Sequence, residues 1–187
     1  MSLKRLGASI TRVEFNLKHT SNELIELWSL AIAAESAIEC KEYEKQGIDL
    51  SNDLPSELIQ WNERYFKEKD RLNEYIAAKN EIKVEFDRLF KEFDLIISPV
   101  TCSLAPINSN DGNTLGPEYI NGQKVDRLLG FATTSIVNYI GYPACSIPAG
   151  FGKHHLLIGL QMIGKYMDDE TVLQAASHYE KINPYLK

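Results

Sequence analysis

The sequence predicts an α/β protein, and three observations support that fold class. Residues 1–94 hold most of the charged residues but only two of the 11 glycines and one of the 7 prolines, which is typical of amphipathic surface helices. A short apolar run at 94–99 closes with Pro99 and predicts a buried strand. Two further apolar segments, 144–149 and 156–163, flank a glycine-containing connection and predict a hairpin.

The composition is that of an ordinary globular domain. The chain has 187 residues, of which 44% are hydrophobic and 25% charged, so it can bury a core without disulfides or metals. Collagen-like, disordered and mini-protein classes are excluded. A net charge of -6 argues against nucleic acid and anionic membranes as partners, because both require a basic face. The three cysteines lack C-x-x-C spacing, and we expect a cytoplasmic protein with reduced thiols and no membrane span.

The first half contains signals for a strand and two helical stretches. Residues 10–15 alternate between apolar and polar side chains and predict a short strand. Thr20 and Glu23 have capping-box spacing and open a helix that is expected to end near Gly47. A second, longer helical stretch is predicted over 56–92, with an aromatic stripe interpreted as core packing. The expected apolar stripe of the first helix comprises Leu24, Leu27, Ala31, Ala34 and Ile38.

The second half predicts a loop, a short helix, the hairpin and a last helix. Residues 101–130 are rich in glycine and proline and predict a long ordered loop, followed by a helix over 132–140. Pro148 inside a strand requires a sheet edge or a bulge, and Gly159 predicts a close approach of the neighbouring backbone. Acidic residues at 168–170 open the last helix.

The common catalytic motifs are missing from the sequence. It contains no G-x-S-x-G elbow, no phosphate-binding loop and no H-E-x-x-H pair. His154 and His155 are adjacent in the hairpin connection and are interpreted as exposed turn residues rather than metal ligands. Motifs alone therefore predict no metal, no cofactor and no catalytic residue.

Four segments of the second half occur in a characteristic order, and two more precede them. Residues 138–144, 146–151, 158–164 and 169–180 resemble, in this order, the C-terminal signature of the amidase signature family. Upstream, residues 93–99 with Pro106 are similar to a strand and proline-containing loop of the family, and 33–37 to one of its helices. The resemblance thus spans almost the whole chain.

The resemblance implies that residues 1–187 form the C-terminal portion of a single amidase domain, with a mixed β-sheet flanked by helices. Residues 1–3 are compatible with a short added leader. Family members hydrolyse carboxylic amides with a Ser–cis-Ser–Lys triad, which lies upstream of the matched part. This sequence has no Gly-Gly-Ser-Ser-Gly run. We therefore expect no catalytic residue here, no activity of this chain alone, and its own N-terminal portion as its partner.

The implied role is to complete the sheet and to wall the substrate pocket. Glutamine-using relatives hold an ammonium with an Asp, and alignment on Asn138 places Phe131 there, although Asp126 lies nearby. A small neutral amide is therefore the expected substrate, as for aliphatic and aryl amidases and 6-aminohexanoate-cyclic-dimer hydrolases. A glutamyl-tRNA amidotransferase subunit is a less favoured alternative. The candidate pocket residues are Phe131, Thr134, Asn138 and Gln161.

A function of a different class is a non-catalytic α/β interaction module. It would share the fold but have no chemistry of its own. Under the amidase hypothesis, the sheet surface and edge that the N-terminal portion would cover stay exposed, so we expect the isolated chain to form homo-oligomers.

Overall fold

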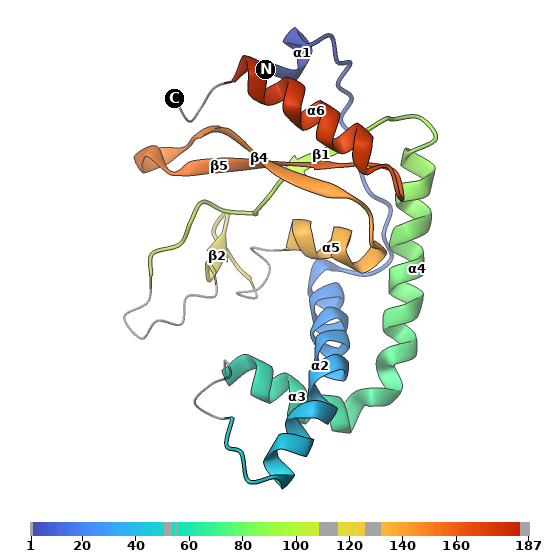
Figure 1. The fold of residues 1–187 in the computed structure, drawn as a ribbon, viewed down its shortest axis with the longest axis vertical. Helices are drawn as coiled ribbons and strands as arrows, with labels where there is room; N and C mark the ends of the chain where they lie inside the picture. Colours follow the sequence, from blue (N-terminus) through green and yellow to red (C-terminus); the bar gives the residue numbers. More distant parts are fainter. Residues whose placement is uncertain (1, 51–53, 55, 109–115, 126–131, 184–187) are drawn as a thin grey trace.

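A three-stranded sheet with helices on both faces organises the chain (Figure 1). The computed structural model describes residues 2–50, 54, 56–108, 116–125 and 132–183. The spatial order is β1 (Ile96–Pro99), β5 (Leu157–Ile163) and β4 (Ala144–Phe151), and both pairings are antiparallel. Helix α6 (Asp169–Ile182) covers one face, and α5 (Ala132–Ile140) lies against the other. The α/β class is confirmed; the parallel pairings of a mixed sheet are not among the described ones.

The alternation of side chains along the strands divides the core into two clusters. Ile96 and Ile163, which are opposite each other in the ladder, pack with the helices on the α5 face. Met162 and Ile147 point to the other face, where they pack against Tyr179 of α6. The short helix α1 (Ser2–Arg5) contributes Leu3 to this second cluster. The sheet is thus covered on both sides at these positions, whereas the hairpin end of β4 and β5 stays exposed.

Helix α2 (Ser21–Lys45) begins with the expected capping box. The Glu23 N–H donates to Thr20 Oγ1 at 3.3 Å, and the Thr20 N–H donates to Glu23 Oε2 at 2.7 Å. The buried side of α2 changes along the helix. The N-terminal half of α2 contacts α4 and α5, and the remainder contacts α3. The expected stripe is wrong beyond Leu27: Ile38 is 57% exposed. The buried positions there are Ser29, Leu30, Ala33 and Ala37.

The long helical stretch predicted over 56–92 is two helices, α3 (Ser56–Glu68) and α4 (Leu72–Leu89), joined by the 3₁₀ turn η1 (Lys69–Arg71). Residues 67–71 are all charged, so no apolar side chain ties this part of the chain to the core. Arg71 bridges the turn, with its Nη1 at 3.0 Å from Glu68 Oε2 and its Nε at 3.0 Å from Glu74 Oε2. The chain changes direction there and leaves α4 alongside α2 (Figure 1).

The strand predicted at residues 10–15 is wrong, because this segment pairs with no strand among the described residues. Its apolar side chains pack on α4 instead, and the Phe15 ring lies 5.1 Å from that of Phe86. Directly after this segment, the backbone N–H of Asn16 donates to Glu85 Oε1 at 3.1 Å, and the backbone N–H of Lys18 donates to Glu81. Carboxylates of a helix thus take the place of a neighbouring strand.

The predicted loop at 101–130 contains a small hairpin in its described part. Strands β2 (Tyr119–Ile120) and β3 (Gln123–Lys124) pair antiparallel across Asn121 and Gly122. Both turn residues have positive φ, 53° and 79°, as a type I′ turn requires. The Asn-Gly pair is a usable hairpin signal that the loop prediction leaves out.

The prediction for Pro148 in the β4–β5 hairpin is confirmed, whereas the close neighbour of Gly159 is a side chain and not the predicted backbone. Pro148 lies on the outer strand of the described sheet, and the register shifts between Pro148 and Gly150. A Cβ on Gly159 would lie 2.6 Å from Val100 Cγ2, closer than a real contact permits. His154 and His155 are exposed in the 3₁₀ turn η3 (Lys153–His155), and no metal-binding group of three or more His, Cys, Asp or Glu occurs among the described residues.

Within the described ranges, no helix combines the length and the apolar character that crossing a membrane requires.

Candidate functional site

The beginning of α5 is fixed to the sheet by the buried amide of Gln161. Its Nε2 donates to Ser98 Oγ and to the Thr133 carbonyl, each at 3.1 Å, and its side chain is 4% exposed. Ser98 and Gln161 are ladder partners on β1 and β5, which places both under α5. Because an unpaired buried amide is costly, this arrangement holds the first turn of α5 in one place.

A second hydrogen bond connects the same turn to the end of β1. Thr133 Oγ1 donates to the Val100 carbonyl at 2.6 Å, and Ser98 Oγ donates to the Pro99 carbonyl at 3.1 Å. We call Ser98, Val100, Thr133 and Gln161 the α5 anchor. Since both hydroxyls donate to carbonyl oxygens, neither is paired with a base that would activate it as a nucleophile. The α5 anchor therefore positions backbone and does not itself carry nucleophilic chemistry.

Cys102 lies close to the α5 anchor and Cys145 lies on the opposite, α6 face of the sheet, and neither thiol is activated. Partial burial raises the pKa of the Cys102 thiol, although a hydrogen bond with the Thr133 backbone opposes this effect. Burial likewise raises the pKa of Cys145 on β4. Both thiols are therefore protonated at neutral pH, and a protonated thiol is a poor nucleophile.

The structure brings together only part of the predicted pocket set. Gln161 reaches the beginning of α5, and Thr134 is half-buried in the same turn. Asn138 is exposed one turn further along, and the two hydrogen bonds of the Gln161 amide go to Ser98 and Thr133 rather than to it. Phe131 and Asp126 lie outside the described residues.

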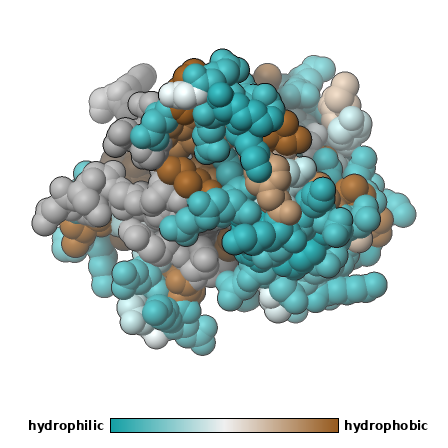
Figure 2. Space-filling view, turned by 90° about the horizontal axis from the view of Figure 1, so that it is seen from below, coloured by the Kyte–Doolittle hydropathy of each residue, from teal (hydrophilic) through white to brown (hydrophobic). Residues whose placement is uncertain are grey.

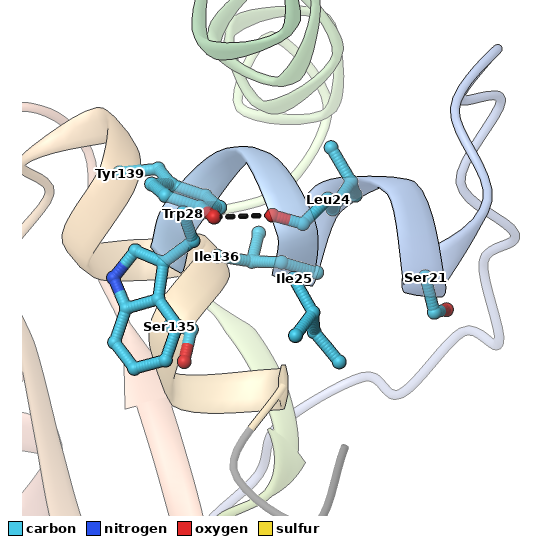
Figure 3. A pocket seen from close by; sticks show the side chains of 7 residues that line it. All are labelled: Ser21, Leu24, Ile25, Trp28, Ser135, Ile136 and Tyr139. Carbon is cyan, nitrogen blue, oxygen red and sulfur yellow. Dashed lines mark hydrogen bonds between the residues drawn. The ribbon is translucent and has the colours of Figure 1, made fainter. Parts of the chain in front are cut away.

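A hollow of about 20 Å³ lies between α2 and α5, and we call it the α2–α5 hollow (Figure 3). Among the described lining residues, Tyr139 is the only ionisable side chain. Its hydroxyl donates to the Leu24 carbonyl, and burial raises its pKa, so the phenol is neutral. A neutral, mainly apolar lining suits an uncharged group. The lining consists of Ser21, Leu24, Ile25, Trp28, Ser135, Ile136 and Tyr139.

Aromatic packing fixes the Trp28 wall of this hollow. The Trp28 ring lies 6.4 Å from that of Tyr139 at 81° and 6.4 Å from that of Trp61 at 59°. Tyr75 of α4 packs against Tyr139, and the centroids of the two rings lie 5.5 Å apart. Sequence reasoning places no pocket residue on α2, because one tryptophan in an amphipathic helix indicates only packing. The α2–α5 contact joins residues 115 positions apart.

A larger hollow of about 270 Å³ lies at the α2–α3 end. Lys41 Nζ sits 4.2 Å above the Phe66 ring there, and Glu44 and Glu63 also line the hollow. This end of the molecule is mostly hydrophilic, with hydrophobic residues in small separate patches (Figure 2). The mixture of charges favours no single class of ligand.

Comparison with known proteins defines the class. The family model described as Amidase matches residues 2–173, and the chain therefore belongs to the amidase family. A bacterial aryl acylamidase of the amidase signature enzymes is 26% identical, with a TM-score of 0.91 over 98% of this chain and 38% of its own. The structure of a 6-aminohexanoate cyclic dimer hydrolase is 22% identical, with a TM-score of 0.71 over 98% of this chain and 39% of its own, which shows a shared fold.

A curated relative carries a different name. The glutamyl-tRNA(Gln) amidotransferase subunit of Bacillus thuringiensis (strain Al Hakam) is 33% identical over 108 residues, which cover 56% of this chain. That match spans only 20% of the relative's own length. The chain thus corresponds to a minor part of each of these proteins. The comparisons agree on the family but not on one activity.

Proposed function

We propose that this chain forms the C-terminal part of an amide-hydrolysing enzyme whose Ser–cis-Ser–Lys triad lies outside these residues, on their N-terminal side. The family match over residues 2–173 carries the proposal. The absence of a Gly-Gly-Ser-Ser-Gly run in the sequence supports the location of the triad. So do the hydroxyls of the α5 anchor, which donate to carbonyl oxygens instead of facing a base.

In this proposal the chain positions and selects the substrate. The triad serine attacks the amide carbonyl, the amine leaves with a proton, and water hydrolyses the resulting ester to the acid. The α5 anchor holds the first turn of α5, and the α2–α5 hollow receives an uncharged part of the substrate. Since orientation of the reacting groups contributes strongly to rate, these contacts act on catalysis without entering the chemistry.

The substrate we propose is a small neutral amide, with aryl amides as the first class to test. The neutral lining of the hollow supports an uncharged group, and the 26% identical aryl acylamidase supports the aryl class. Cys40, Cys102 and Cys145 are free thiols, which supports the proposal of a reducing, cytoplasmic location.

The second candidate is a glutamyl-tRNA amidotransferase subunit. The 33% identity over 108 residues favours it. Against it, the resemblance places Phe131 at the position where glutamine-using relatives have an Asp, and a phenyl ring cannot pair with an ammonium as a carboxylate does. Measuring ammonia released from glutamine distinguishes the two candidates, because only the amidotransferase subunit is expected to release it.

The test compares the protein encoded by the complete reading frame with residues 1–187 alone. We expect the complete protein to release aniline from chromogenic anilides, and to be blocked by a serine-directed fluorophosphonate. Residues 1–187 alone should release none, since the nucleophile is elsewhere.

Turnover by residues 1–187 alone would contradict the proposed location of the triad. Hydrolysis of glutamine but of no anilide would favour the amidotransferase. No turnover of any amide by the complete protein would contradict the amidase proposal and favour an interaction module.

A further inference from the structure

We infer that Trp28 determines which amides the enzyme prefers, by limiting the α2–α5 hollow to a small uncharged end group of the substrate. The inference rests on the proposed function and concerns the same site. Trp28 would act as a specificity-determining residue, and would not take part in bond breaking.

The charge of the lining restricts the ligand to a neutral group. Of the seven lining residues that the structure describes, three are aliphatic, two are aromatic and two are serines, and none of these carries a charge at neutral pH. Tyr139 stays neutral because burial raises its pKa, and its hydroxyl is engaged by the Leu24 carbonyl. A carboxylate or ammonium placed here would meet no opposite charge in the described lining, which disfavours its removal from water.

The size of the hollow restricts the ligand further. Its volume is about 20 Å³. A cavity of roughly 10–15 Å³ is needed to hold one water, whereas a cavity of about 150 Å³ binds benzene. The hollow is open to solvent on one side, so it encloses a group of about methyl size, and a phenyl ring would not fit within it.

Trp28 is the largest side chain of the lining, and its truncation enlarges the hollow without breaking a hydrogen bond between α2 and α5. Leu24 and Ile25 are 5% and 6% exposed and belong to the tightly buried part of α2. Tyr139 joins α5 to α2 through its hydrogen bond. Trp28 is half-buried, lies at the wall of the hollow and makes none of the hydrogen bonds that connect the two helices (Figure 3).

The experiment measures substrate preference in the complete protein with two graded series of anilides. One series lengthens the acyl chain from acetyl to hexanoyl, and the other enlarges the para substituent of the aniline. Trp28→Ala should raise kcat/KM for the largest member relative to the smallest by about tenfold or more in one series, since each methylene in an apolar pocket is worth roughly 10-fold or more. Trp28→Phe should give a smaller shift.

Two further variants keep the inference testable if Trp28→Ala does not fold. Ile136→Ala enlarges the same hollow from α5, and should shift the same series in the same direction. Phe66→Ala is the control: Phe66 on α3 lines the other hollow and has its ring contact with Tyr65 rather than with Trp28, so the ratio should stay unchanged. Equal ratios in wild type, Trp28→Ala and Ile136→Ala, or a shift only in Phe66→Ala, would overturn the inference.

A binding measurement separates this inference from the proposed function. Aryl alkyl ketones of graded alkyl length contain no hydrolysable bond, and calorimetry on the complete protein gives their relative affinities. If no amide is hydrolysed but Trp28→Ala shifts the ketone ratio about tenfold toward longer chains, the size limit is supported although the amidase proposal fails. If amides are hydrolysed but Trp28→Ala changes neither the kcat/KM ratio of the anilides nor the affinity ratio of the ketones, the amidase proposal stands and the role of Trp28 is refuted.

Discussion

At the scale of single residues, the buried amide of Gln161 connects two parts of the chain that meet only in the folded state. Its two hydrogen bonds reach β1 through Ser98 and α5 through Thr133. The resemblance to the amidase signature family identifies Gln161 from sequence, but does not indicate its partners. A pattern of residue types names a position, whereas its partners depend on how strands and helices pack.

Replacement of this amide should destabilise the protein. We expect Gln161→Leu to lower the free energy of unfolding by about 1–3 kcal/mol, because the Thr133 carbonyl loses its buried donor. Gln174→Leu is the matched control: the Gln174 amide donates to Glu170 on the exposed side of α6 and should cost less than about 0.5 kcal/mol. Urea unfolding measures both, and equal losses would contradict the structural role of Gln161.

Substitution by glutamate should make this loss depend on pH. In Gln161→Glu a carboxylate would face the Thr133 carbonyl oxygen, so the folded-state pKa would rise above the unfolded value of about 4.3. The protonated form can still donate, so the variant should be near wild type below about pH 4.3 and lose stability as the pH rises through the folded pKa. A constant difference from pH 3 to 8 would count against this explanation.

At the scale of elements, α4 organises the segment that precedes α2. Glu85 is 7% exposed and accepts hydrogen bonds from the Asn16 N–H at 3.1 Å and from Arg88 at 2.8 and 2.9 Å. Glu81 accepts from the Lys18 N–H, and its Oε2 lies 3.0 Å from His19 Nδ1. The segment is thus held by side-chain carboxylates, whose charge is needed for the strength of these bonds.

Neutralising Glu85 should loosen this contact in a pH-dependent way. The Arg88 guanidinium, together with the Asn16 N–H, holds the pKa of Glu85 below its usual value. Stability from a lowered carboxyl pKa is present above the unfolded pKa, about 4.3, and is lost as the pH falls through the folded pKa. Glu85→Gln should therefore cost about 1–2 kcal/mol at pH 7, and less below pH 4.

A second glutamate–arginine pair provides the control for this experiment. Glu74 pairs with Arg71 at 3.0 Å with the same spacing along the chain, but its side chain is 55% exposed. Glu74→Gln should change stability by less than about 0.5 kcal/mol. Thermal unfolding at pH 4 and pH 7 compares the two variants, and a loss in Glu85→Gln that does not vary with pH would contradict the pKa argument.

Local signals predict most elements, and those that fail depend on tertiary neighbours. The capping box at Thr20 and Glu23 and the helix over 132–140 follow from short-range chemistry, and both are confirmed. The alternation at 10–15 predicts a strand wrongly, because packing against a helix produces the same pattern. The break at η1 also escapes prediction, since a fully charged run is compatible with a continuous exposed helix.

At the scale of the whole molecule, the tip of the β4–β5 hairpin leaves apolar surface uncovered. Phe151, Leu157 and Ile158 are 55%, 50% and 39% exposed at this end of the sheet. Within the described residues, the outer edges of β1 and β4 have no partner strand. Exposed apolar residues beside open strand edges favour association between chains.

We therefore expect residues 1–187 alone to self-associate. Sedimentation velocity should show oligomers whose proportion rises with concentration, and Phe151→Glu with Leu157→Glu should shift the distribution toward monomer. Leu173→Glu, on the exposed side of α6, is the control for added charge and should have a smaller effect. A strict monomer at high concentration would contradict the expectation.

Only part of the candidate site can be predicted from the sequence, because the rest depends on how distant elements pack together. The family resemblance identifies Gln161 and Thr134, and the structure brings both to the beginning of α5. It does not identify Trp28, because the α2–α5 hollow exists only where two helices far apart in sequence meet. Shape and volume are properties of packed elements, and a residue pattern does not contain them.

The bulge in β4 limits what can be added to this edge of the sheet. A fourth strand laid along β4 would find regular ladder geometry beside Ala144 to Ile147, then a residue without an N–H at Pro148 and a shifted register by Gly150. Continuous pairing along the full strand is therefore interrupted after about four residues. Contacts that copies of the chain make along β4 are therefore limited to a short ladder.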